Sequence, residues 1–398
     1  MNPNNSKTLV IAPQPFFSPR GTPFSVYYRT LVSAELNVEQ DFLTYGQGEN
    51  VLIAGVRFFR TPAFRWLGPI KIGPSLLKLF HDIFISLRLI ELLLRNRYSC
   101  VHAHEEAVFM ALFLKPLFRF KLIYDMHSSL PQQLDNFKFS NARFLVRIFT
   151  WLENKSLAAS DAIITICPDL YNYVESVLPN NKKNFLIENS IFEPVRLARQ
   201  EELSGSEESE LPVPIPRSFA QCIVYAGTLE PYQGIDILID AMAFVSQMNS
   251  KAGLIIVGGT PEQVELYRRQ AATLNIEERI LFTGRLPQTQ ARAYSRVADV
   301  LVSPRSSGTN TPLKIYEQLA SGIPLVATNI YSHTQVLTPE VSFLVRPDPE
   351  DLARGIGEAL LPNGPGKEIA ARARELYERE YSRAAYVEKL RRVLETLN

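Results

Sequence analysis

The sequence predicts an α/β protein made of two doubly wound parallel sheets, one in each half of the chain. Short apolar runs alternate with helix-length periodic stretches throughout both halves, and this alternation is typical of parallel strands covered by helices. The length of 398 residues allows two or three domains. The hydrophobic share of 46% and the charged share of 21% are those of a globular protein with a large core.

The apolar runs give the expected strands and the amphipathic stretches give the expected helices. In the first half, the expected strands are Thr8–Ala12, Ser99–His102, Lys121–Tyr124, Ala162–Ile166 and Asn184–Ile187, with helices at Phe24–Ala34, Ala107–Phe113 and Ala142–Ala159. In the second half, the strands are Cys222–Tyr225, Gly253–Val257, Ile280–Phe282, Val300–Val302, Leu325–Ala327 and Ser342–Leu344, with helices at Gly234–Val245, Pro261–Leu274, Thr289–Val297 and Thr311–Ala320.

One long apolar region, Ile70–Leu94, is interrupted by Lys78, His81, Asp82, Arg88 and Glu91, and its polar residues recur roughly every three or four positions. This spacing predicts an amphipathic helix that covers a sheet and not a membrane span. Docking on a membrane surface is the alternative. Aromatic and basic residues at Phe58–Lys71 and Phe113–Lys121 would suit such docking, and surface packing explains them equally well.

The best domain boundary is residues 193–217, which contain the acidic Ser/Gly-rich run Glu201–Glu210 followed by Pro212, Pro214 and Pro216. Such a composition is typical of a linker or surface excursion because it cannot form a packed core. We therefore expect domains at 1–192 and 218–375. Residues 376–398 are expected to form a C-terminal helix that caps a domain or crosses back.

The charge balance argues against an extended nucleic-acid surface, because 42 Lys and Arg residues face 41 Asp and Glu residues. The three cysteines do not suggest a disulfide framework. The segment Met1–Ser6 is polar, and the apolar stretch Leu9–Ala12 is too short for a signal core. We therefore expect a cytoplasmic protein without a nucleic-acid partner, and leave open a peripheral position at the cytosolic face of a membrane.

The strongest candidate site is the segment Ser303–Glu317, which runs from a strand through a polar loop into a helix. Thr311 is the expected N-cap and Pro312 the expected first helical residue. The free amides of the first helical turn attract anions, and Lys314 and Arg305 add positive charge, so a diphosphate would fit there. Glu317, one turn further, could accept hydrogen bonds from ribose hydroxyls. A capped surface helix with a solvated lysine and glutamate explains the spacing equally well.

Polar residues also follow the strands of the first half, where ligands of doubly wound sheets bind. Arg20, Gly21 and Thr22 lie between the first strand and a helix, and an ordinary turn is the alternative reading of this loop. The run His102-Ala-His-Glu-Glu106 raises the idea of a metal site, but its spacing does not match the helix-borne His-Glu-x-x-His motif. We expect no metal there. The better interpretations are that His104 or Glu105 binds acceptor hydroxyls, or that the run simply ends a strand.

The second half resembles glycosyltransferase family 4 in five stretches of sequence. These stretches are Arg305–Lys314 with Glu317, Ala320–Thr328, Tyr225–Leu229 with Gln233 and Gly234, and the strand ends Ile255–Gly259 and Phe282–Leu286. The resemblance implies a GT-B fold, in which two Rossmann-like domains face each other across a cleft. It also implies a retaining, metal-independent transfer from a nucleoside diphosphate sugar to a glycan or lipid-linked acceptor. No cofactor is implied, since the nucleotide sugar is a substrate.

The resemblance assigns roles residue by residue. His127 matches the histidine that contacts the transferred sugar and, with Lys314 and Glu317, makes up the expected catalytic set; Asp125 is expected to orient its ring. The expected donor-binding residues are Gly227, Thr228, Gly258, Gly259, Arg285, Arg305, Gly308, Thr309, Asn310, Thr311, Pro312 and Leu313. The expected acceptor or cleft residues are Arg20, Gly21, Thr22, His104, Glu105 and Asp125.

Three positions depart from the family pattern. Thr309 stands where members commonly carry an acidic residue, and Thr228 and Gln233 stand where they commonly carry Arg and Lys. Because of these departures, one alternative function is that of a catalytically weakened protein that binds a nucleotide sugar. A sugar-nucleotide epimerase or phosphorylase on the same fold is the other alternative. Dinucleotide-dependent redox, NTP hydrolysis and serine hydrolysis are disfavoured because the G-x-G-x-x-G, P-loop and G-x-S-x-G motifs do not occur.

Overall fold

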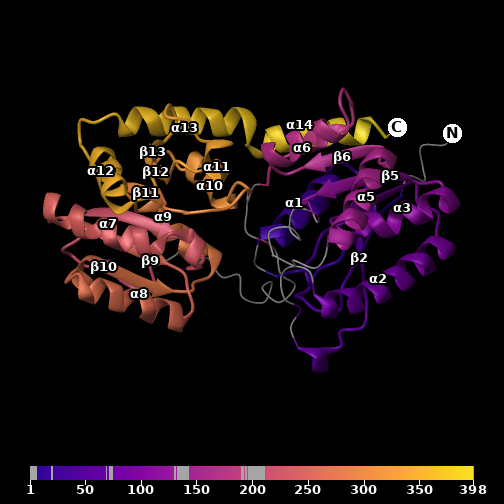
Figure 1. Cartoon of the computed structure of the whole chain (residues 1–398), viewed down its shortest axis with the longest axis horizontal. Coiled ribbons are helices and arrows are strands. Elements are labelled where there is room, and N and C mark those ends of the chain that lie inside the picture. Colours follow the sequence, from indigo (N-terminus) through magenta and orange to yellow (C-terminus); the bar gives the residue numbers. More distant parts are fainter. Residues whose placement is uncertain are drawn as a thin grey trace. The chain divides into compact units, whose positions relative to one another are not determined.

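The computed structural model describes residues 7–18, 21–68, 70, 75–129, 131, 143–189, 192, 195 and 211–397. The chain forms two compact units (Figure 1). The first combines Met1–Leu203 with the C-terminal segment Tyr386–Asn398, and the second is Ser204–Ala385. Within the described residues, every helix falls short of the length and hydropathy that a bilayer-spanning segment requires.

The described strands of the first unit form one parallel sheet in the order β3-β2-β1-β4-β5-β6-β7. The strands are β1 (Lys7–Ala12), β2 (Glu39–Thr44), β3 (Val56–Arg60), β4 (Cys100–His104), β5 (Lys121–Met126), β6 (Ala162–Thr165) and β7 (Asn184–Leu186). The chain adds strands to one side of β1 and then returns to add β4 on the other. The carboxyl ends of β1 and β4 are therefore the switch point at which doubly wound sheets bind ligands.

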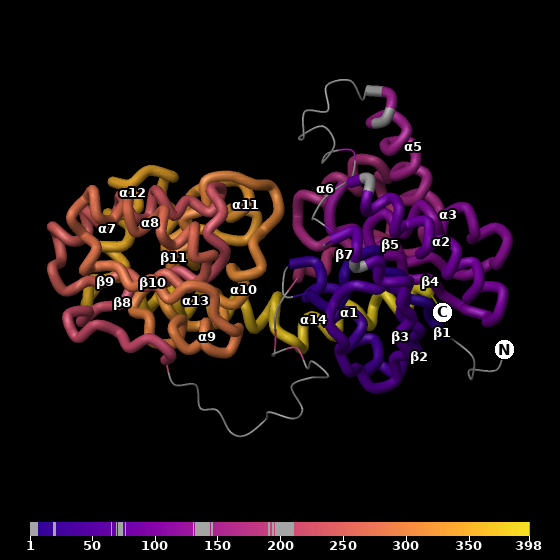
Figure 2. Tube along the Cα trace, turned by 90° about the horizontal axis from the view of Figure 1, so that it is seen from below, coloured from indigo at the N-terminus to yellow at the C-terminus, as the bar shows by residue number. Residues whose placement is uncertain are grey.

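Helices cover both faces of this sheet (Figure 2). The helices are α1 (Gly21–Glu35), α2 (Leu76–Arg95), α3 (Ala107–Phe118), α5 (Arg143–Ala159), α6 (Pro168–Val177) and α14 (Arg383–Glu395), with a short 3₁₀ turn η1 (Arg65–Leu67). Helices α2, α3, α5 and α6 share one buried apolar cluster with the sheet, and α1 and α14 pack on the opposite face. The last helix of the chain therefore completes the core of the first unit.

Strand alternation decides which side chains of β4 and β5 face α1 and α14. Val101 and Ala103 belong to the core beneath α2 and α3, whereas Cys100 packs with Tyr386 of α14. Because successive side chains on a strand point to opposite faces, His102 and His104 share the face of Cys100. The same alternation places Asp125 on that face.

The described strands of the second unit form a parallel sheet in the order β10-β9-β8-β11-β12-β13. The strands are β8 (Gln221–Ala226), β9 (Ala252–Val257), β10 (Ile280–Gly284), β11 (Val300–Ser303), β12 (Leu325–Thr328) and β13 (Phe343–Val345). Its helices are α7 (Ile235–Met248), α8 (Pro261–Thr273), α9 (Gln288–Arg296), α10 (Leu313–Ala320), α11 (Tyr331–Thr334), α12 (Pro349–Ala359) and α13 (Gly366–Glu380), with 3₁₀ turns η2 (Pro231–Gln233) and η3 (Glu277–Arg279). Helices α7, α8 and α12 cover one face, and α9, α10 and α13 cover the other. The switch point here lies between β8 and β11.

Strands β2 and β3 and helices α6 and α12 are absent from the sequence-based expectation. Strand β2 was not predicted because Gln40 and Asp41 interrupt its apolar run, although both side chains are buried. Asp41 is compensated by Lys7 at 2.8 Å, Arg57 at 2.8 Å and Tyr98 at 2.6 Å. A buried charge of this kind is tolerated because it is paired and hydrogen-bonded.

The unit boundaries differ in position from the expected ones. Most of the expected linker at 193–217 lies outside the described residues. Helix α13 continues through the expected boundary at 375 and stays in the second unit, and the chain passes to the first unit only at Tyr386. The expected helix in Ile70–Leu94 is present as α2, which begins at Leu76.

Candidate functional site

Three strand-end loops of the second unit meet through glycine backbones. The Gly227 amide donates to the Val257 carbonyl at 3.0 Å, and the Gly258 amide donates to the Gly284 carbonyl at 2.9 Å. A Cβ atom on Gly258, whose φ is +131°, would lie 1.9 Å from the Gly227 carbonyl oxygen. Glycine is therefore required at this position, both for its backbone conformation and for the close approach of the loops.

The loop after β11 packs against the turn η2 that precedes α7. The Ser306 amide donates to the Tyr232 carbonyl at 3.0 Å. A Cβ atom on Gly234 would lie 2.0 Å from the Pro304 carbonyl oxygen. The expected donor loops on both sides of the switch point are thus in direct contact.

Arg305 shapes the loop in which it lies. Its guanidinium donates to the Ser307 carbonyl at 2.7 Å and to the Asn310 carbonyl at 3.1 Å. It also lies 5.2 Å from the centre of the Tyr232 ring. Gly308, with φ of +125°, leaves room for this side chain, because a Cβ atom there would lie 2.3 Å from the guanidinium. The Thr309 carbonyl accepts a hydrogen bond from Gln335.

The start of α10 corrects one sequence-based expectation. The helix begins at Leu313, and its N-cap is Pro312 and not Thr311. Proline has no hydroxyl or carboxamide oxygen, so no side chain caps the first turn. The Thr311 hydroxyl is buried without a hydrogen-bond partner. Of the first-turn amides, that of Ile315 donates to the Pro312 carbonyl at 3.0 Å, and the N-cap side chain leaves those of Leu313 and Lys314 for another acceptor.

Lys314 lies in this first turn and is partly buried. Its ammonium is 4.1 Å from the centre of the Tyr225 ring and 3.4 Å from the Gln233 side-chain oxygen. Among the residues that the structure describes, no carboxylate forms an ion pair with it. Burial, with a smaller contribution from Arg305, lowers the pKa of Lys314 to about 7. The site therefore holds a lysine whose charge would be stabilised by a bound anion.

Glu317, one turn further along α10, is engaged by a cation. Arg292 of α9 donates to one Glu317 carboxylate oxygen at 2.6 Å and 3.2 Å. Both side chains are partly exposed. Arg292 is a residue that the sequence reasoning missed, and its position on α9 gave no signal of this pairing.

A buried histidine beneath the loop was also missed. His333 of α11 donates from Nδ1 to the Thr328 carbonyl at 2.8 Å, and its Nε2 lies 3.0 Å from the Ser303 hydroxyl. The Thr328 hydroxyl in turn donates to the Arg305 carbonyl. Burial lowers the pKa of His333 to about 4, with smaller contributions from Lys314 and Arg305. The neutral imidazole thus ties the ends of β11 and β12 to the loop that holds Arg305.

The switch point of the first unit carries the other expected residues. Gly21 and Thr22 open α1, and Arg20 lies outside the described residues. Glu105 follows β4 with φ of +50°, and its amide donates to the Asp125 carbonyl at 3.0 Å. Burial raises the pKa of Glu105 to about 7, although Lys78 opposes that change.

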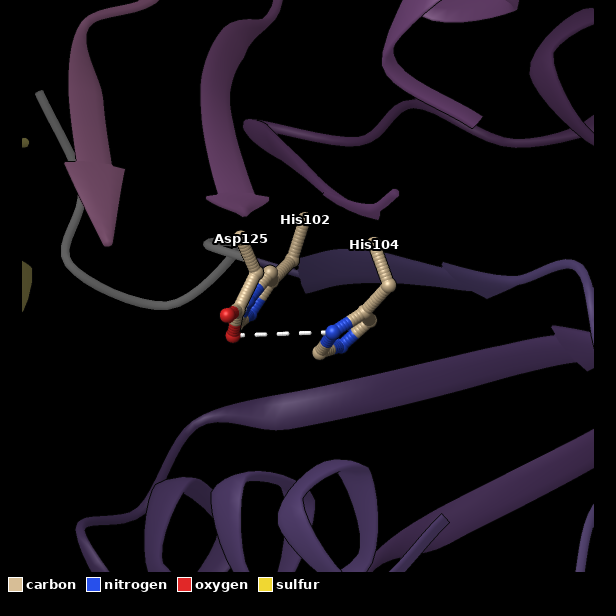
Figure 3. Close-up of side chains that lie close together, drawn as sticks. All are labelled: His102, His104 and Asp125. Atoms are coloured by element: carbon tan, nitrogen blue, oxygen red, sulfur yellow. Dashed lines mark hydrogen bonds and ion pairs between the residues drawn. The ribbon is translucent and has the colours of Figure 1, made fainter. Parts of the chain in front are cut away.

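Asp125 of β5 is the centre of a buried network, in which His102 and His104 of β4 lie beside its carboxylate (Figure 3). Arg29 of α1 donates from Nε to Asp125 Oδ2 at 2.9 Å, and His102 Nε2 lies 3.1 Å from the same oxygen. His104 Nδ1 is 3.5 Å from Oδ2, and His127 Nε2 is 3.3 Å from Oδ1. The rings of His104 and His127 are linked at 3.1 Å between Nδ1 and Nε2. Of the expected residues, His104, Asp125 and His127 are therefore brought together, and Arg29 and His102 join them.

The charges in this network are set by burial and by the arginine. Burial opposes ionisation of Asp125, but Arg29 and the neighbouring imidazoles hold its pKa well below the usual range. Burial lowers the pKa of His127 to about 4 and lowers that of His104 as well, and Arg29 adds to both effects. At neutral pH the carboxylate is ionised and both of these imidazoles are neutral.

The types of side chain in this network also include metal ligands. Ligand atoms of His102, His104 and Asp125 lie within 4.8 Å of one another. However, the guanidinium of Arg29 already neutralises the Asp125 oxygen that these histidines approach. A cation placed beside that guanidinium would be repelled, so the arrangement favours a hydrogen-bonded network.

Two family models match the chain, one over each half. "Glycosyltransferase Family 4" matches residues 37–191, and "Glycosyl transferases group 1" matches residues 217–377. The second model includes every expected donor-binding residue. The first includes His104, Glu105, Asp125 and His127.

Curated relatives and solved structures resemble the chain to different extents. A phosphatidyl-myo-inositol mannosyltransferase of Mycobacterium leprae is 32% identical over 42% of this chain and 44% of its own. A putative glycosyltransferase YtcC of Bacillus subtilis is 35% identical over 31% of each chain. The chain thus matches less than half the length of these two relatives.

A sucrose-phosphate synthase of Thermosynechococcus elongatus has a TM-score of 0.74 at 18% identity, covering 99% of both chains. Anabaena Alr3699/HepE in complex with UDP has a TM-score of 0.69 at 17% identity, covering 98% of this chain and 99% of its own. These structures confirm the predicted pair of Rossmann-like parallel sheets of the GT-B type.

Proposed function

The chain belongs to the family 4 and group 1 glycosyltransferases, and from this premise we propose that it transfers a sugar from a nucleoside diphosphate sugar to a glycan or lipid-linked acceptor. The observation that carries the proposal is the position of Lys314. A partly buried lysine, without a carboxylate partner among the described residues, lies in an uncapped helical turn at the switch point of the second sheet. This arrangement suits a diphosphate better than a purely structural role, because an unpaired lysine lowers stability there.

The nucleotide part of the proposal is supported by solved relatives of similar fold. Structures of Anabaena Alr3699/HepE hold UDP in one case and UDP-glucose in another. We propose that this chain binds the same class of donor. Gly227, Thr228, Gly258 and Gly259 would allow the backbone to approach the nucleotide, and the exposed side chain of Arg285 would lie beside its base.

The proposed chemistry is departure of the nucleoside diphosphate, with Lys314 and the first-turn amides of α10 taking up the developing charge. Fixed dipoles and cations stabilise such a leaving group without reorganisation, so no metal ion is required. Arg305 supplies charge and holds the loop that surrounds the phosphates. His127 is proposed to contact the transferred sugar, and Glu317 the ribose or sugar hydroxyls. We further propose retention of anomeric configuration and assign no covalent nucleophile.

The first experiment is a donor screen with the purified full chain and UDP-, GDP- and ADP-sugars. We expect nucleotide release from at least one donor, and Lys314→Ala should reduce it by about a hundredfold. Lys251→Ala is the matched control, because Lys251 is exposed and precedes β9, at the end of the strand opposite the Gly258 loop. Near-normal release by the Lys314→Ala protein would contradict the proposed role.

Two other outcomes correspond to the alternative functions. A nucleotide-sugar-binding protein without turnover is suggested by Thr309, Thr228 and Gln233, and by the pairing of Glu317 with Arg292. It would bind a nucleotide and release no sugar. An epimerase or phosphorylase would act on the donor without an acceptor, and a phosphorylase would require phosphate.

We also propose peripheral contact with an anionic membrane through the outward faces of α2, α3 and α5, which lie beside one another in both overall views. Large apolar side chains are exposed there: Leu79, Ile83, Leu87, Ile90 and Leu94 on α2, Phe113 and Leu117 on α3, and Phe144 and Trp151 on α5. A cavity at the end of α3 is lined by Lys115, Arg119, Lys121 and Asp161, so cations outnumber the carboxylate. Exposed apolar surface beside positive charge matches the chemistry of an anionic lipid surface.

Sedimentation with phosphatidylglycerol vesicles and with phosphatidylcholine vesicles tests this contact. We expect binding to the anionic vesicles and its loss in a Leu87→Glu, Leu94→Glu double variant. Leu266→Glu on α8 is the control, because Leu266 is similarly exposed but lies on the second unit. Equal sedimentation of all three proteins, or no sedimentation of the wild type, would overturn the proposal.

A further inference from the structure

Arg29 lies at the centre of the interface between α1, α14 and the sheet of the first unit. Its side chain is fully buried. Besides Asp125, it contacts the Ile187 carbonyl at 3.4 Å and the face of the Tyr386 ring at 5.3 Å. The last helix is fixed close by, because Lys389 forms an ion pair with Glu188 at 2.7 Å. The C-terminal helix therefore supplies the aromatic surface on which the arginine rests.

The buried ion pair between Arg29 and Asp125 has a cost in hydration free energy. A buried guanidinium and carboxylate lose much of their hydration, and apolar side chains of similar volume often stabilise a fold equally well or better. The ion pair nevertheless determines which atoms accept hydrogen bonds. With Arg29 at its side, Asp125 stays ionised: Oδ2 accepts from Arg29 and lies 3.1 Å from His102 Nε2, while Oδ1 lies 3.3 Å from His127 Nε2 and has no other polar partner among the described residues.

We propose that Arg29 and Tyr386 are positioning residues for His127, acting through the carboxylate of Asp125. Arg29 orients the carboxylate, the carboxylate orients the imidazole, and the Tyr386 ring keeps the guanidinium in place. This inference rests on the proposed function, in which His127 contacts the transferred sugar. It extends that function by linking the end of the chain to the sugar-binding side of the first unit.

The electrostatic consequence can be followed in the pH profile. The charged and titratable groups around His127 are Arg29 from α1, His102 and His104 from β4 and Asp125 from β5, and those around Arg29 also include Glu188 and Tyr386. Arg29 lowers the pKa of His127 and Asp125 raises it. Removal of the arginine charge therefore moves protonation of His127 to higher pH.

The first test compares Arg29→Gln with Arg29→Lys in the full chain. If Arg29 positions His127, Arg29→Gln lowers kcat by about tenfold to a hundredfold with little change in KM for the donor. It also displaces the acidic limb of the kcat profile to higher pH. Arg29→Lys keeps the charge and restores the position of the acidic limb. An unchanged pH profile in Arg29→Gln would overturn the inference.

The second test uses α14, in case the arginine variants do not fold. Tyr386→Phe keeps the ring beside the guanidinium and should retain the wild-type pH profile, whereas Tyr386→Leu removes the ring and should shift it toward that of Arg29→Gln. Val393→Ala is the matched control, because Val393 is buried in the same cluster on the same helix and has neither a ring nor a charge. It should lower the melting temperature and leave the profile unchanged. Identical profiles for Tyr386→Leu and Val393→Ala would contradict the role of Tyr386.

A readout without turnover separates this inference from the proposed function. The chain has five histidines, so the imidazole resonances of His127 can be followed by NMR during a pH titration. Removal of the arginine should raise the pH at which His127 titrates, whether or not sugar is transferred. A wild type inactive with every donor, combined with this NMR shift, would reject the proposed function and keep the positioning role. Identical titration in wild type and Arg29→Gln would reject the positioning role.

Discussion

Proton uptake during nucleotide binding is the most direct consequence of the Lys314 environment. The unliganded protein lowers the pKa of this lysine from 10.5 to about 7, mainly by burial. At pH 8 only about one tenth of the Lys314 side chains would carry a proton. A diphosphate placed against the ammonium favours the charged form, so the lysine should become protonated when the nucleotide binds. The expected uptake is about 0.9 protons per UDP or GDP bound at pH 8.

Isothermal titration calorimetry in two buffers of different ionisation enthalpy measures this uptake. At pH 8 the nucleotide itself is fully ionised, since its last phosphate pKa is about 6. Lys314→Met should abolish the proton uptake and weaken binding, and Lys251→Met should change neither. Tight binding by the wild type with no proton uptake would refute the reasoning about Lys314.

The same pKa has a consequence for stability without a ligand. The folded-state pKa lies below the unfolded-state value, so the unfolded chain binds more protons between pH 7 and pH 10.5. The contribution of Lys314 to the free energy of unfolding should therefore rise with pH across this window. Below pH 7 the lysine destabilises the fold by about 3–4 kcal/mol, an amount that allows for its partial contact with water. Lys314→Met should raise the melting temperature of the unliganded protein at pH 7, which differential scanning calorimetry can measure.

Three further predictions concern the same unit and the proposed chemistry. Glu317→Gln should lower turnover by about tenfold or more, because a neutral amide accepts weaker hydrogen bonds from sugar hydroxyls. The circular dichroism spectrum should remain unchanged, and wild-type turnover would contradict the proposed contact of Glu317 with the hydroxyls. Gly258→Ala should destabilise the protein and prevent nucleotide binding, since its Cβ would lie 1.9 Å from the Gly227 carbonyl oxygen. Gly357→Ala is the control and should retain binding, because Gly357 is helical and its Cβ would lie 3.8 Å from the nearest atom, Met248 Cε. Treatment with EDTA should leave sugar transfer within about twofold of the untreated rate, because the proposed charge stabilisation uses cations and amides of the protein; loss of activity and its return with a divalent metal would reject metal independence.

The fold class could be predicted from periodicity alone, but some strands could not. The strands that the sequence analysis predicted are mostly apolar runs, as expected for strands buried on both faces. Strand β2 carries Asp41 in its centre, and only the partners from β1, β3 and the segment before β4 make that charge tolerable. A local pattern does not contain such partners. The same limitation explains the error at Thr311, whose side chain suits an N-cap although the backbone begins the helix after Pro312.

The candidate sites show the same division between local and long-range information. The segment Arg305–Glu317 and the glycines after β8 and β9 each occupy a short stretch of sequence. Their residue types and order were therefore sufficient to predict a phosphate-binding loop and to identify the family resemblance. The partners of these residues come from distant segments. Arg292 lies 25 positions from Glu317, and Arg29 lies 96 positions from Asp125.

By itself, the sequence determined the alternation of strands and helices, the loops that follow the strands and the family to which the chain belongs, because each depends on residues that are neighbours along the chain. Tertiary structure alone decided that Asp125 is shared by Arg29 and three histidines, that α14 returns to complete the first unit, and that Lys314 has a lowered pKa. These properties depend on burial and on contacts between remote segments, and electrostatic free energies change with both. For this reason the kind of chemistry can be predicted from residue types, whereas the protonation states that govern it follow only from the folded arrangement.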